Sequence, residues 1–246
     1  MCGRFTRKEN LQRLAEQLGL KVIPLLSPRY NIAPSQLVAC VRIYPESEER
    51  EFTELKWGLV PSWATDTSIG NKLINARGEM VAEKPAFRKA FKQQRGLVLA
   101  DGFYEWKREG KTNQPYYIRF KDGRPFAFAG LWERWEKQEP ALETCALITT
   151  VPNALMASIH NRMPVILPEQ SYASWLNLIE SQFTPLKRFC LSNSDDRSHQ
   201  DRRRRIYWAV DDQKDGGLAH GADDGHQPRP PRCAGAVGDC PQERHR

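Results

Sequence analysis

Apolar residues near the start of the chain recur at helical spacing. They lie on one face, at Leu11, Leu14, Ala15 and Leu18. Thr6 and Glu9 precede them with the spacing of a capping box, and Gly19 follows where a helix commonly ends. The pattern therefore predicts a helix that starts after Thr6 and ends at Gly19.

Runs of apolar and β-branched residues predict strands further along the chain. These runs cover residues 37–43, 53–60, 96–101, 114–120, 126–132 and 144–150. Asp122 and Gly123 lie between two of the runs, where an Asp-Gly pair predicts a hairpin turn. Two further helices are expected, one opened by Pro85 and one by Pro168. Their apolar positions are Phe87, Ala90 and Phe91 in the first, and Tyr172, Trp175, Leu176 and Ile179 in the second.

The order of these elements is β-rich and lacks the regular strand–helix alternation of a parallel sheet. Composition changes abruptly after about residue 186, because the segment 190–246 is rich in Asp, Arg, Gly, His and Pro. Its one clear apolar run is 206–210, so it can bury little surface. We expect one domain over residues 2–185 and a disordered or aberrant tail over 190–246.

Charge and cysteine usage narrow the class of protein. The chain has 246 residues and a net charge of +7, which favours an acidic partner such as nucleic acid but does not decide for one. Its six cysteines form no CxxC pair and are irregularly spaced, as is typical of a reducing compartment. We find no signal peptide and no apolar stretch near the roughly 20 residues that span a bilayer. We therefore expect a soluble, cytoplasmic protein with no membrane partner.

Cys2 directly follows the initiator methionine, and small residues there generally permit its removal. Cys2 would then carry an α-amine and a thiol, with reference pKa values of about 8 and about 8.5. Such a 1,2-aminothiol reacts with an aldehyde: the amine forms an imine, and the thiol closes a five-membered thiazolidine. An internal cysteine cannot do this, because its nitrogen belongs to an amide. Taken alone, Cys2 is better explained as an ordinary residue in a loose terminus.

Short motifs spread along the chain favour a functional explanation of Cys2. In order, they are Met1-Cys2-Gly3-Arg4-Phe5, Asn31-Ile32-Ala33-Pro34, Trp57-Gly58-Leu59-Val60-Pro61-Ser62-Trp63, Asn75-Ala76-Arg77-Gly78-Glu79, Ala100-Asp101-Gly102-Phe103-Tyr104-Glu105-Trp106, Thr149-Thr150 and His160-Asn161-Arg162-Met163-Pro164. With them the chain resembles the SOS response-associated peptidase (SRAP) family, the abasic-site-shielding proteins. Any one motif is weak, but their shared order over about residues 2–180 is specific.

The resemblance implies an α+β fold: a single β-rich domain with a barrel-like, mainly antiparallel sheet and flanking helices. It also implies a DNA–protein crosslink, made through the N-terminal cysteine at abasic sites in single-stranded DNA. No cofactor or metal is expected, and we expect a monomer, associated with the nucleoid if the source is bacterial. Four site positions carry over: Cys2, Asn75, Glu105 and His160.

Chemistry suggests a role for each position. Cys2 would attack the aldehyde by nitrogen first and by sulfur second. Glu105, if buried among its aromatic neighbours, would transfer protons as the sugar opens and as water leaves the imine. His160 is the other acid–base candidate, because the other four histidines lie in the tail. Asn75 would hydrogen-bond the amine or the sugar.

Each of these residues also has an ordinary explanation. A single Glu in a strand usually points to solvent, a single His near a helix end is usually structural, and a single Asn near a loop is usually a turn residue. The strand alternation would place Glu105 opposite Tyr104 and Trp106. Together with Cys2 and the motif order, the functional interpretation is favoured.

Six residues are candidates for DNA contacts. Three arginines within two residues of the catalytic positions would bind phosphates beside the reacting sugar, as the family's corresponding arginines do: Arg4, Arg77 and Arg162. Three residues in loop-like segments could contact bases: Asn31, Pro34 and Trp63. For Trp63, core packing is an equal alternative. Core packing is preferred for Trp57, Trp132, Trp135 and Trp175.

Two other functions remain open. A cysteine-dependent peptidase would use Cys2 with a nearby His, although only Met1 precedes Cys2 and no oxyanion-hole sequence is evident. A noncatalytic single-stranded DNA-binding module would need the basic and aromatic residues but not Cys2. A weak lyase activity, by β-elimination from the imine, would accompany the crosslinker.

The tail departs from the family pattern. We expect a further strand and a Val-Asn-type motif near the end of the domain and do not find them, so the tail is interpreted as an out-of-frame translation or a divergent extension. The basic run 202–205 is best explained as solvated. Cys233 and Cys240, with His226 and His245, match no standard zinc spacing.

Overall fold

The computed structural model describes residues 2–9, 11–20, 25–44, 49–177 and 208–212. All of them belong to one compact unit, Met1–Lys214. Within this described part of the chain, no helix is long and apolar enough to cross a membrane.

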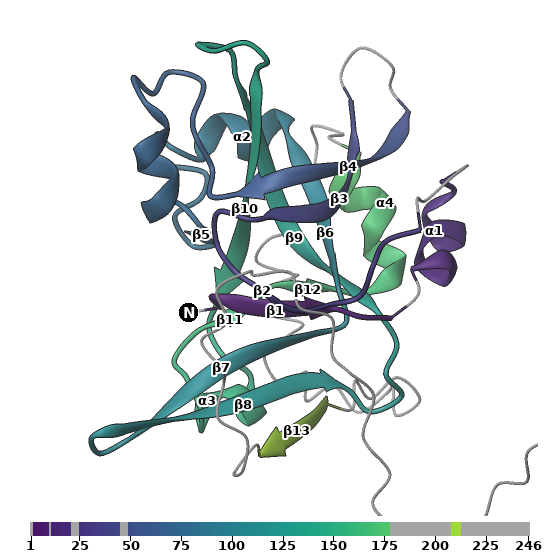
Figure 1. The fold of residues 1–246 in the computed structure, drawn as a ribbon, viewed down its shortest axis with the longest axis vertical. Helices are drawn as coiled ribbons and strands as arrows, with labels where there is room; N and C mark the ends of the chain where they lie inside the picture. The colour runs from purple at the N-terminus through teal and green to yellow at the C-terminus, as the bar shows by residue number, and fades with distance from the viewer. Residues whose placement is uncertain (1, 10, 21–24, 45–48, 178–207, 213–246) are drawn as a thin grey trace, which may run out of the picture. The chain divides into compact units, whose positions relative to one another are not determined.

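A closed five-stranded barrel forms the centre of the fold (Figure 1). Around the barrel the strands follow the order β10, β4, β3, β6 and β9, and β9 pairs again with β10. Their bounds are Leu37–Ile43 for β3, Arg50–Trp57 for β4, Arg95–Ala100 for β6, Phe126–Trp135 for β9 and Leu142–Thr150 for β10. The β10–β4 pairing is parallel and the other pairings around the ring are antiparallel. The expected barrel-like, mainly antiparallel sheet is confirmed.

Three short strands extend this sheet beside the barrel. β5 (Asn75–Arg77) runs parallel to β10, and β11 (Met163–Pro164) runs antiparallel to it. β12 (Ile166–Leu167) pairs with β9. The second half of β10 is therefore flanked by two segments that are far apart in the sequence.

A second, antiparallel sheet lies below the barrel in Figure 1. Its order is β13-β8-β7-β1-β2. The bounds are Arg4–Arg7 for β1, Arg29–Ile32 for β2, Gly102–Glu109 for β7, Thr112–Phe120 for β8 and Trp208–Asp212 for β13. β1 pairs with β7 on one edge and β2 on the other, so the N-terminal strand is internal to the sheet.

β13 corrects one expectation from the sequence. A strand does follow the change in composition near residue 186, because residues 208–212 pair with β8 from Phe120 to Tyr116. The strand overlaps the apolar run at 206–210. The rest of the tail lies outside the described residues, so the domain boundary at 185 stays a prediction.

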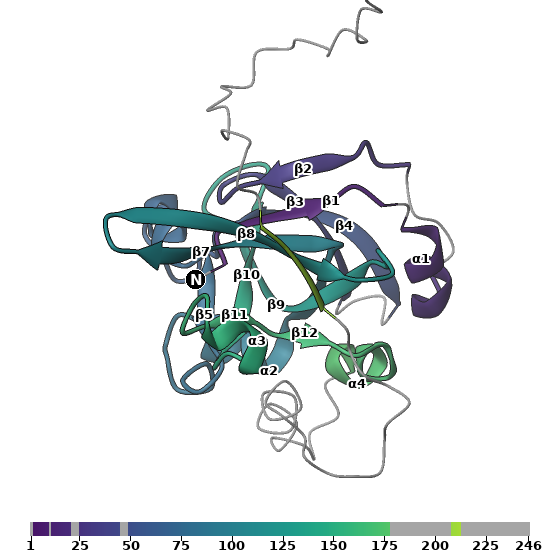
Figure 2. The same ribbon diagram turned by 90° about the horizontal axis from the view of Figure 1, so that it is seen from below.

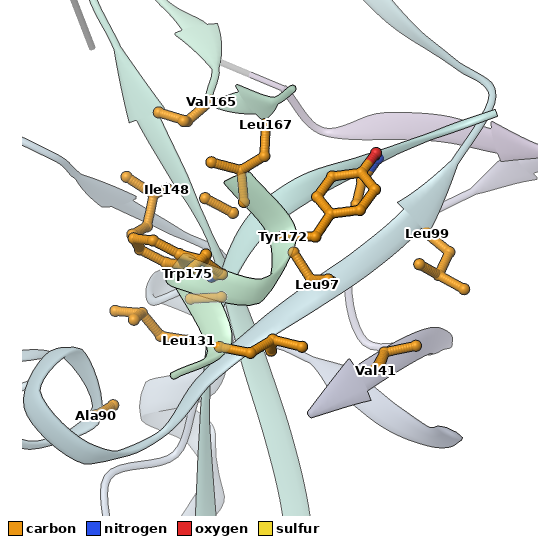
Figure 3. Packing of buried hydrophobic residues seen from close by; sticks show 14 of the residues in the cluster. Val41, Ala90, Leu97, Leu99, Leu131, Ile148, Val165, Leu167, Tyr172 and Trp175 are labelled. Atoms are coloured by element: carbon orange, nitrogen blue, oxygen red, sulfur yellow. The ribbon is translucent and has the colours of Figure 1, made fainter. Parts of the chain in front are cut away.

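Short helices flank the two sheets (Figure 1). Their bounds are Gln12–Leu18 for α1, Arg88–Gln93 for α2, Ala154–Ala157 for α3 and Tyr172–Leu176 for α4, with 3-10 turns at Thr67–Lys72 (η1) and Glu169–Ser171 (η2). Figure 3 shows Tyr172 and Trp175 of α4 packed against Leu97 and Leu99 of β6. Val98, between those two leucines, belongs instead to the cluster shared with the second sheet. Alternate residues of β6 thus face the helices and the barrel interior.

The four tryptophans assigned to the core are all buried, which confirms that prediction: Trp57, Trp132, Trp135 and Trp175. The helices expected after Pro85 and Pro168 are confirmed as α2 and as η2 with α4; Ile179 lies outside the described residues.

Two local predictions were wrong. Thr6 does not cap α1, because it belongs to β1; the helix instead starts after Leu11 without a side-chain cap. Its end is as predicted, since Gly19 has a φ of 64° in the left-handed region. Asp122 and Gly123 do not make a hairpin, because they connect β8 in one sheet to β9 in the other. The hairpin in this region is β7–β8, where Glu109 pairs with Thr112.

A buried carboxylate anchors the N-terminal strand. Asp101 is 1% exposed and accepts hydrogen bonds from the Thr6 hydroxyl and from the backbone N–H groups of Lys8 and Glu9, the last at 2.7 Å. The Tyr117 hydroxyl lies 2.9 Å from Thr6 Oγ1, and burial raises the pKa of Tyr117 to about 12. Asp101 therefore fixes the chain at the end of β1, where its pairing with β7 stops.

We expect Asp101→Asn to lower the free energy of unfolding by about 2 kcal/mol, because the amide loses charge and offers donors where three donors already point. For a domain of this size, that corresponds to a fall in Tm of roughly 4–8 °C. Thermal denaturation followed by circular dichroism measures it. Asp122→Asn, the same change at an exposed turn, is the control; equal shifts for both variants would show that Asp101 is no anchor.

Candidate functional site

The pairing of β1 with β7 places Cys2. Arg4 pairs with Tyr104 and Phe5 with Phe103, so the chain before Arg4 continues alongside Glu105. The Phe5 ring packs 5.2 Å from that of Trp57 and 5.6 Å from that of Phe128, which fixes the strand over the barrel. Cys2 lies at the start of an internal, anchored strand.

The Cys2 side chain is fully buried, and its Sγ lies 3.9 Å from the carbonyl oxygen of Arg4. Burial is the larger cause that raises the pKa of the Cys2 thiol well above its ordinary value, and the negative charge of Glu105 raises it further. The thiol is therefore neutral at physiological pH. The register of β1 with β7 brings Glu105 alongside the residues that precede Arg4.

Asn75 contacts Cys2 directly. β5 holds Asn75 opposite Leu147 of β10, and its Nδ2 donates to the Cys2 carbonyl at 2.8 Å. The Oδ1 atom of Asn75 is buried and has no hydrogen-bond partner among the described residues. A buried amide oxygen of this kind is an acceptor available to a nearby donor.

Glu105 is 2% exposed, so the expectation that a single strand Glu points to solvent is wrong here. Tyr104 and Trp106, on the other face of β7, are only partly buried, as the strand alternation predicted. The Trp106 N–H lies 3.4 Å from Glu105 Oε1. β7 thus points a carboxyl group inward, toward Cys2.

His160 lies after α3, in the segment that leads to β11. Its backbone N–H donates to Met156 at 2.8 Å, and its Nδ1 accepts from the Arg162 N–H at 3.0 Å. The same Nδ1 lies 3.2 Å from the Arg162 carbonyl oxygen, so either tautomer of the ring satisfies one of the two contacts. Figures 1 and 2 both place the N-terminus beside β5 and β11, so the His160 segment lies on the same side of the barrel as Cys2 and Asn75.

The three candidate arginines differ in what they contact. Arg77, at the end of β5, is exposed. The Nη1 of partly buried Arg4 donates to the Gly3 carbonyl at 2.8 Å. Arg162 donates to both carboxylate oxygens of Glu79, at 2.8 and 3.0 Å, and to the Thr149 carbonyl at 2.7 Å. Arg162 therefore already holds an anion of the protein itself.

The loop after β4 presents Trp63. This side chain is 56% exposed, so core packing is the wrong explanation for it. The loop is rigidly held: Val60 N–H donates to Thr144 Oγ1 at 2.9 Å, and a Cβ on Gly58 would lie 2.8 Å from the Gly70 carbonyl oxygen. Gly58 itself has a φ of 135°.

The loop that contains Pro34 is joined to the same region. Ser35 N–H donates to the Trp57 carbonyl at 2.7 Å, which brings the second and third sequence motifs together. Pro34 is partly buried, and Asn31 in β2 is exposed. Within the described part of the chain, no hydrogen bond joins Asn31 or Pro34 to Cys2, so they form a separate part of the candidate surface.

Three supporting residues were missed by the sequence analysis: Asp101, Thr149 and Glu79. Each lies inside a motif that was recognised, but nothing in the spacing distinguishes a supporting residue from its neighbours. The Thr149 carbonyl accepts from both the Gly78 N–H, at 2.8 Å, and Arg162. It joins the Asn75 segment to the His160 segment.

A metal centre finds no support in the described residues, where no group of three or more His, Cys, Asp or Glu side chains could hold an ion. Cys2, Cys40 and Cys145 are buried and free. Cys233, Cys240, His226 and His245, whose spacing matches no standard zinc site, lie outside the described residues.

Comparisons with known proteins identify the family of this chain. A family model described as SOS response associated peptidase (SRAP) matches residues 1–201. Abasic site processing protein YoqW of Bacillus subtilis is 46% identical over 182 residues, which is 72% of this chain and 80% of the relative. Abasic site processing protein YedK of Escherichia coli is 30% identical over 182 residues, 72% of this chain and 79% of the relative.

Solved structures share the fold. A protein from Bacteroides thetaiotaomicron matches with a TM-score of 0.67 at 27% identity, over 77% of this chain and 86% of its own. A phage-related protein from Bordetella bronchiseptica matches with a TM-score of 0.61 at 27% identity, over 85% and 93%. The chain belongs to the SOS response-associated peptidase (SRAP) family.

Proposed function

We propose that this chain processes abasic sites by forming a thiazolidine crosslink between Cys2 and the abasic aldehyde in single-stranded DNA, which shields the lesion. The observation that carries the proposal is the surrounding of Cys2: Asn75 donates to its carbonyl, and the register of β1 with β7 brings the buried Glu105 alongside the same segment. The relatives named as abasic site processing proteins support the same substrate.

Removal of Met1 is the first requirement. In the 246-residue chain the nitrogen of Cys2 belongs to a peptide bond, and an amide nitrogen does not attack an aldehyde. Removal of the methionine creates the α-amine beside Asn75. The buried Oδ1 of Asn75 is then an acceptor that can orient this amine or a sugar hydroxyl.

The state of the thiol sets the order of the steps. Burial and Glu105 keep the thiol protonated, and a neutral thiol is a weak nucleophile. The amine therefore adds to the carbonyl carbon first, and loss of one water gives the imine. The sulfur then adds to the imine carbon, while the thiol proton ends on the nitrogen. Water is the sole by-product.

Glu105 and His160 move the protons. The buried Glu105 can take a proton from the adding nitrogen and give it to the hydroxyl that leaves as water, and can then relay the thiol proton to the nitrogen during ring closure. His160, whose Nδ1 contacts the Arg162 backbone, is the second acid–base candidate for opening the sugar. The exposed Arg77 is available for a neighbouring phosphate, and the exposed Trp63 for a base.

Cys2→Ala should abolish the adducts that survive denaturant while noncovalent binding of single-stranded DNA persists, because only the thiazolidine needs residue 2. Denaturing gels and intact-mass spectrometry with an abasic oligonucleotide measure the adduct and the loss of Met1 together. Unchanged adducts would refute the proposal. If the wild-type protein cleaves a peptide and forms no adduct with abasic DNA, and Cys2→Ala loses the cleavage, the chain is a peptidase instead.

Cys2→Ser tests the sulfur alone. Serine keeps the amine but closes a less stable oxygen ring, so we expect an imine that borohydride traps and no stable adduct. The wild-type protein, by contrast, should give a stable adduct without borohydride. An adduct of equal stability from the serine variant would exclude the thiazolidine.

Glu105→Gln should slow adduct formation by about 100-fold, the lower range for loss of a general acid–base group, because the amide cannot transfer protons. Glu109→Gln, at an exposed position of the same strand β7, is the matched control and should leave the rate unchanged. The time course of adduct formation on denaturing gels measures both. Equal rates for the two variants would remove Glu105 from the mechanism.

A further inference from the structure

Arg162 and Glu79 form a two-pronged ion pair at the edge of the site. Nη1 and Nη2 of Arg162 donate to Oε1 and Oε2 of Glu79, at 2.8 and 3.0 Å. Nη2 also donates to the Thr149 carbonyl at 2.7 Å and lies 3.2 Å from its Oγ1. The arginine side chain is 14% exposed and the glutamate side chain 46% exposed.

The two partners differ in how firmly they are held. Arg162 is fixed from behind by Thr149, so its guanidinium cannot turn without losing contacts to β10. The Glu79 carboxylate accepts two hydrogen bonds from Arg162, and nearly half of its side chain meets solvent. If the pair opens, the carboxylate is the group that moves away.

The edge of Arg162 that Glu79 occupies is the edge that recognises phosphate. Arginine binds carboxylates and phosphates through the same parallel pair of N–H donors. Although burial opposes it, the hydrogen bonds from Arg162 and the charges of Arg162 and Arg77 hold the pKa of Glu79 below its ordinary value. Glu79 is therefore an anion at neutral pH, placed near two arginines that are candidates for DNA phosphates.

We propose that Glu79 is an exchangeable internal counter-ion: it occupies the phosphate-binding edge of Arg162 in the free protein and gives it up to a DNA phosphate. This inference rests on the proposed function, in that DNA passes over Arg162. The exchange breaks one ion pair for each one formed with DNA, so Arg162 adds little net affinity for any strand. Noncovalent binding stays weak and reversible. The protein therefore distinguishes abasic from undamaged DNA in the covalent step, in which only an aldehyde reacts.

The test compares two neutralised carboxylates on the same turn. Glu79→Gln removes the counter-ion, whereas Glu83→Gln removes an equal charge at an exposed position whose side chain makes no hydrogen bond or ion pair with the described residues. Both are made in the Cys2→Ala background, so that only noncovalent binding is measured. Fluorescence anisotropy with an undamaged single-stranded oligonucleotide gives the Kd.

We expect Glu79→Gln to tighten binding by about three- to five-fold, the upper range for a partly exposed ion pair that no longer has to be broken. Glu83→Gln should change the Kd by less than about two-fold, because its charge is screened by solvent. Binding that is weaker in Glu79→Gln, or changed equally in both variants, overturns the inference: the first result makes Glu79 a positioning residue, and the second makes the effect one of net charge.

Arg162→Ala sharpens the comparison. If Glu79 acts through Arg162, Glu79→Gln should give no gain when Arg162 is already absent. A persisting gain overturns the inference. Thermal melts check that each variant is folded. If Arg162→Ala does not fold, the comparison of Glu79→Gln with Glu83→Gln still tests the inference. Abasic-DNA adducts of the wild-type protein report on the proposed function separately, because the crosslink does not involve Glu79.

Discussion

The structure depends on fixing the N-terminal strand β1, and with it residue 2, in one position. The first residues of most domains are poorly ordered, yet here the strand that begins at Arg4 is paired on both edges and its Phe5 is inserted between Trp57 and Phe128. Asp101 closes the far end of that strand through three hydrogen bonds. Residue 2 is thereby given a defined position, which a reactive terminus needs if its partners are to be effective.

The barrel supplies those partners from distant parts of the sequence. β10 is the central element, because its second half holds β5 with Asn75 on one side and β11, just after His160, on the other. The carbonyl of Thr149 joins both segments by accepting from Gly78 and Arg162. The catalytic candidates are thus fixed by backbone pairing and by the hydrogen bond from Asn75 to the Cys2 carbonyl, and the carboxyl group of Glu105 comes from the second sheet.

Local patterns predicted much of this fold. The strand at 37–43 and the glycine that ends α1 follow from residue type and spacing alone. Short strands such as β5 and β11 could not be found this way, since two or three residues carry no period. The pairing of β8 with β13 rather than β9 was also beyond reach, because an Asp-Gly turn looks the same whether it joins neighbours or two sheets. For the site, the motif order named Cys2, Asn75, Glu105 and His160, but the Glu79–Arg162 pair appears only when the two segments are brought together.

The internal position of β1 has a mechanical consequence. A DNA strand attached at Cys2 would transmit any pull from a passing motor protein directly into β1. Because β1 is bonded to β2 and β7 on opposite edges, that load is spread over two ladders of hydrogen bonds at once, instead of unzipping one edge bond by bond. The position of β1 between β2 and β7 would therefore let a single covalent attachment at Cys2 withstand force without unfolding the domain.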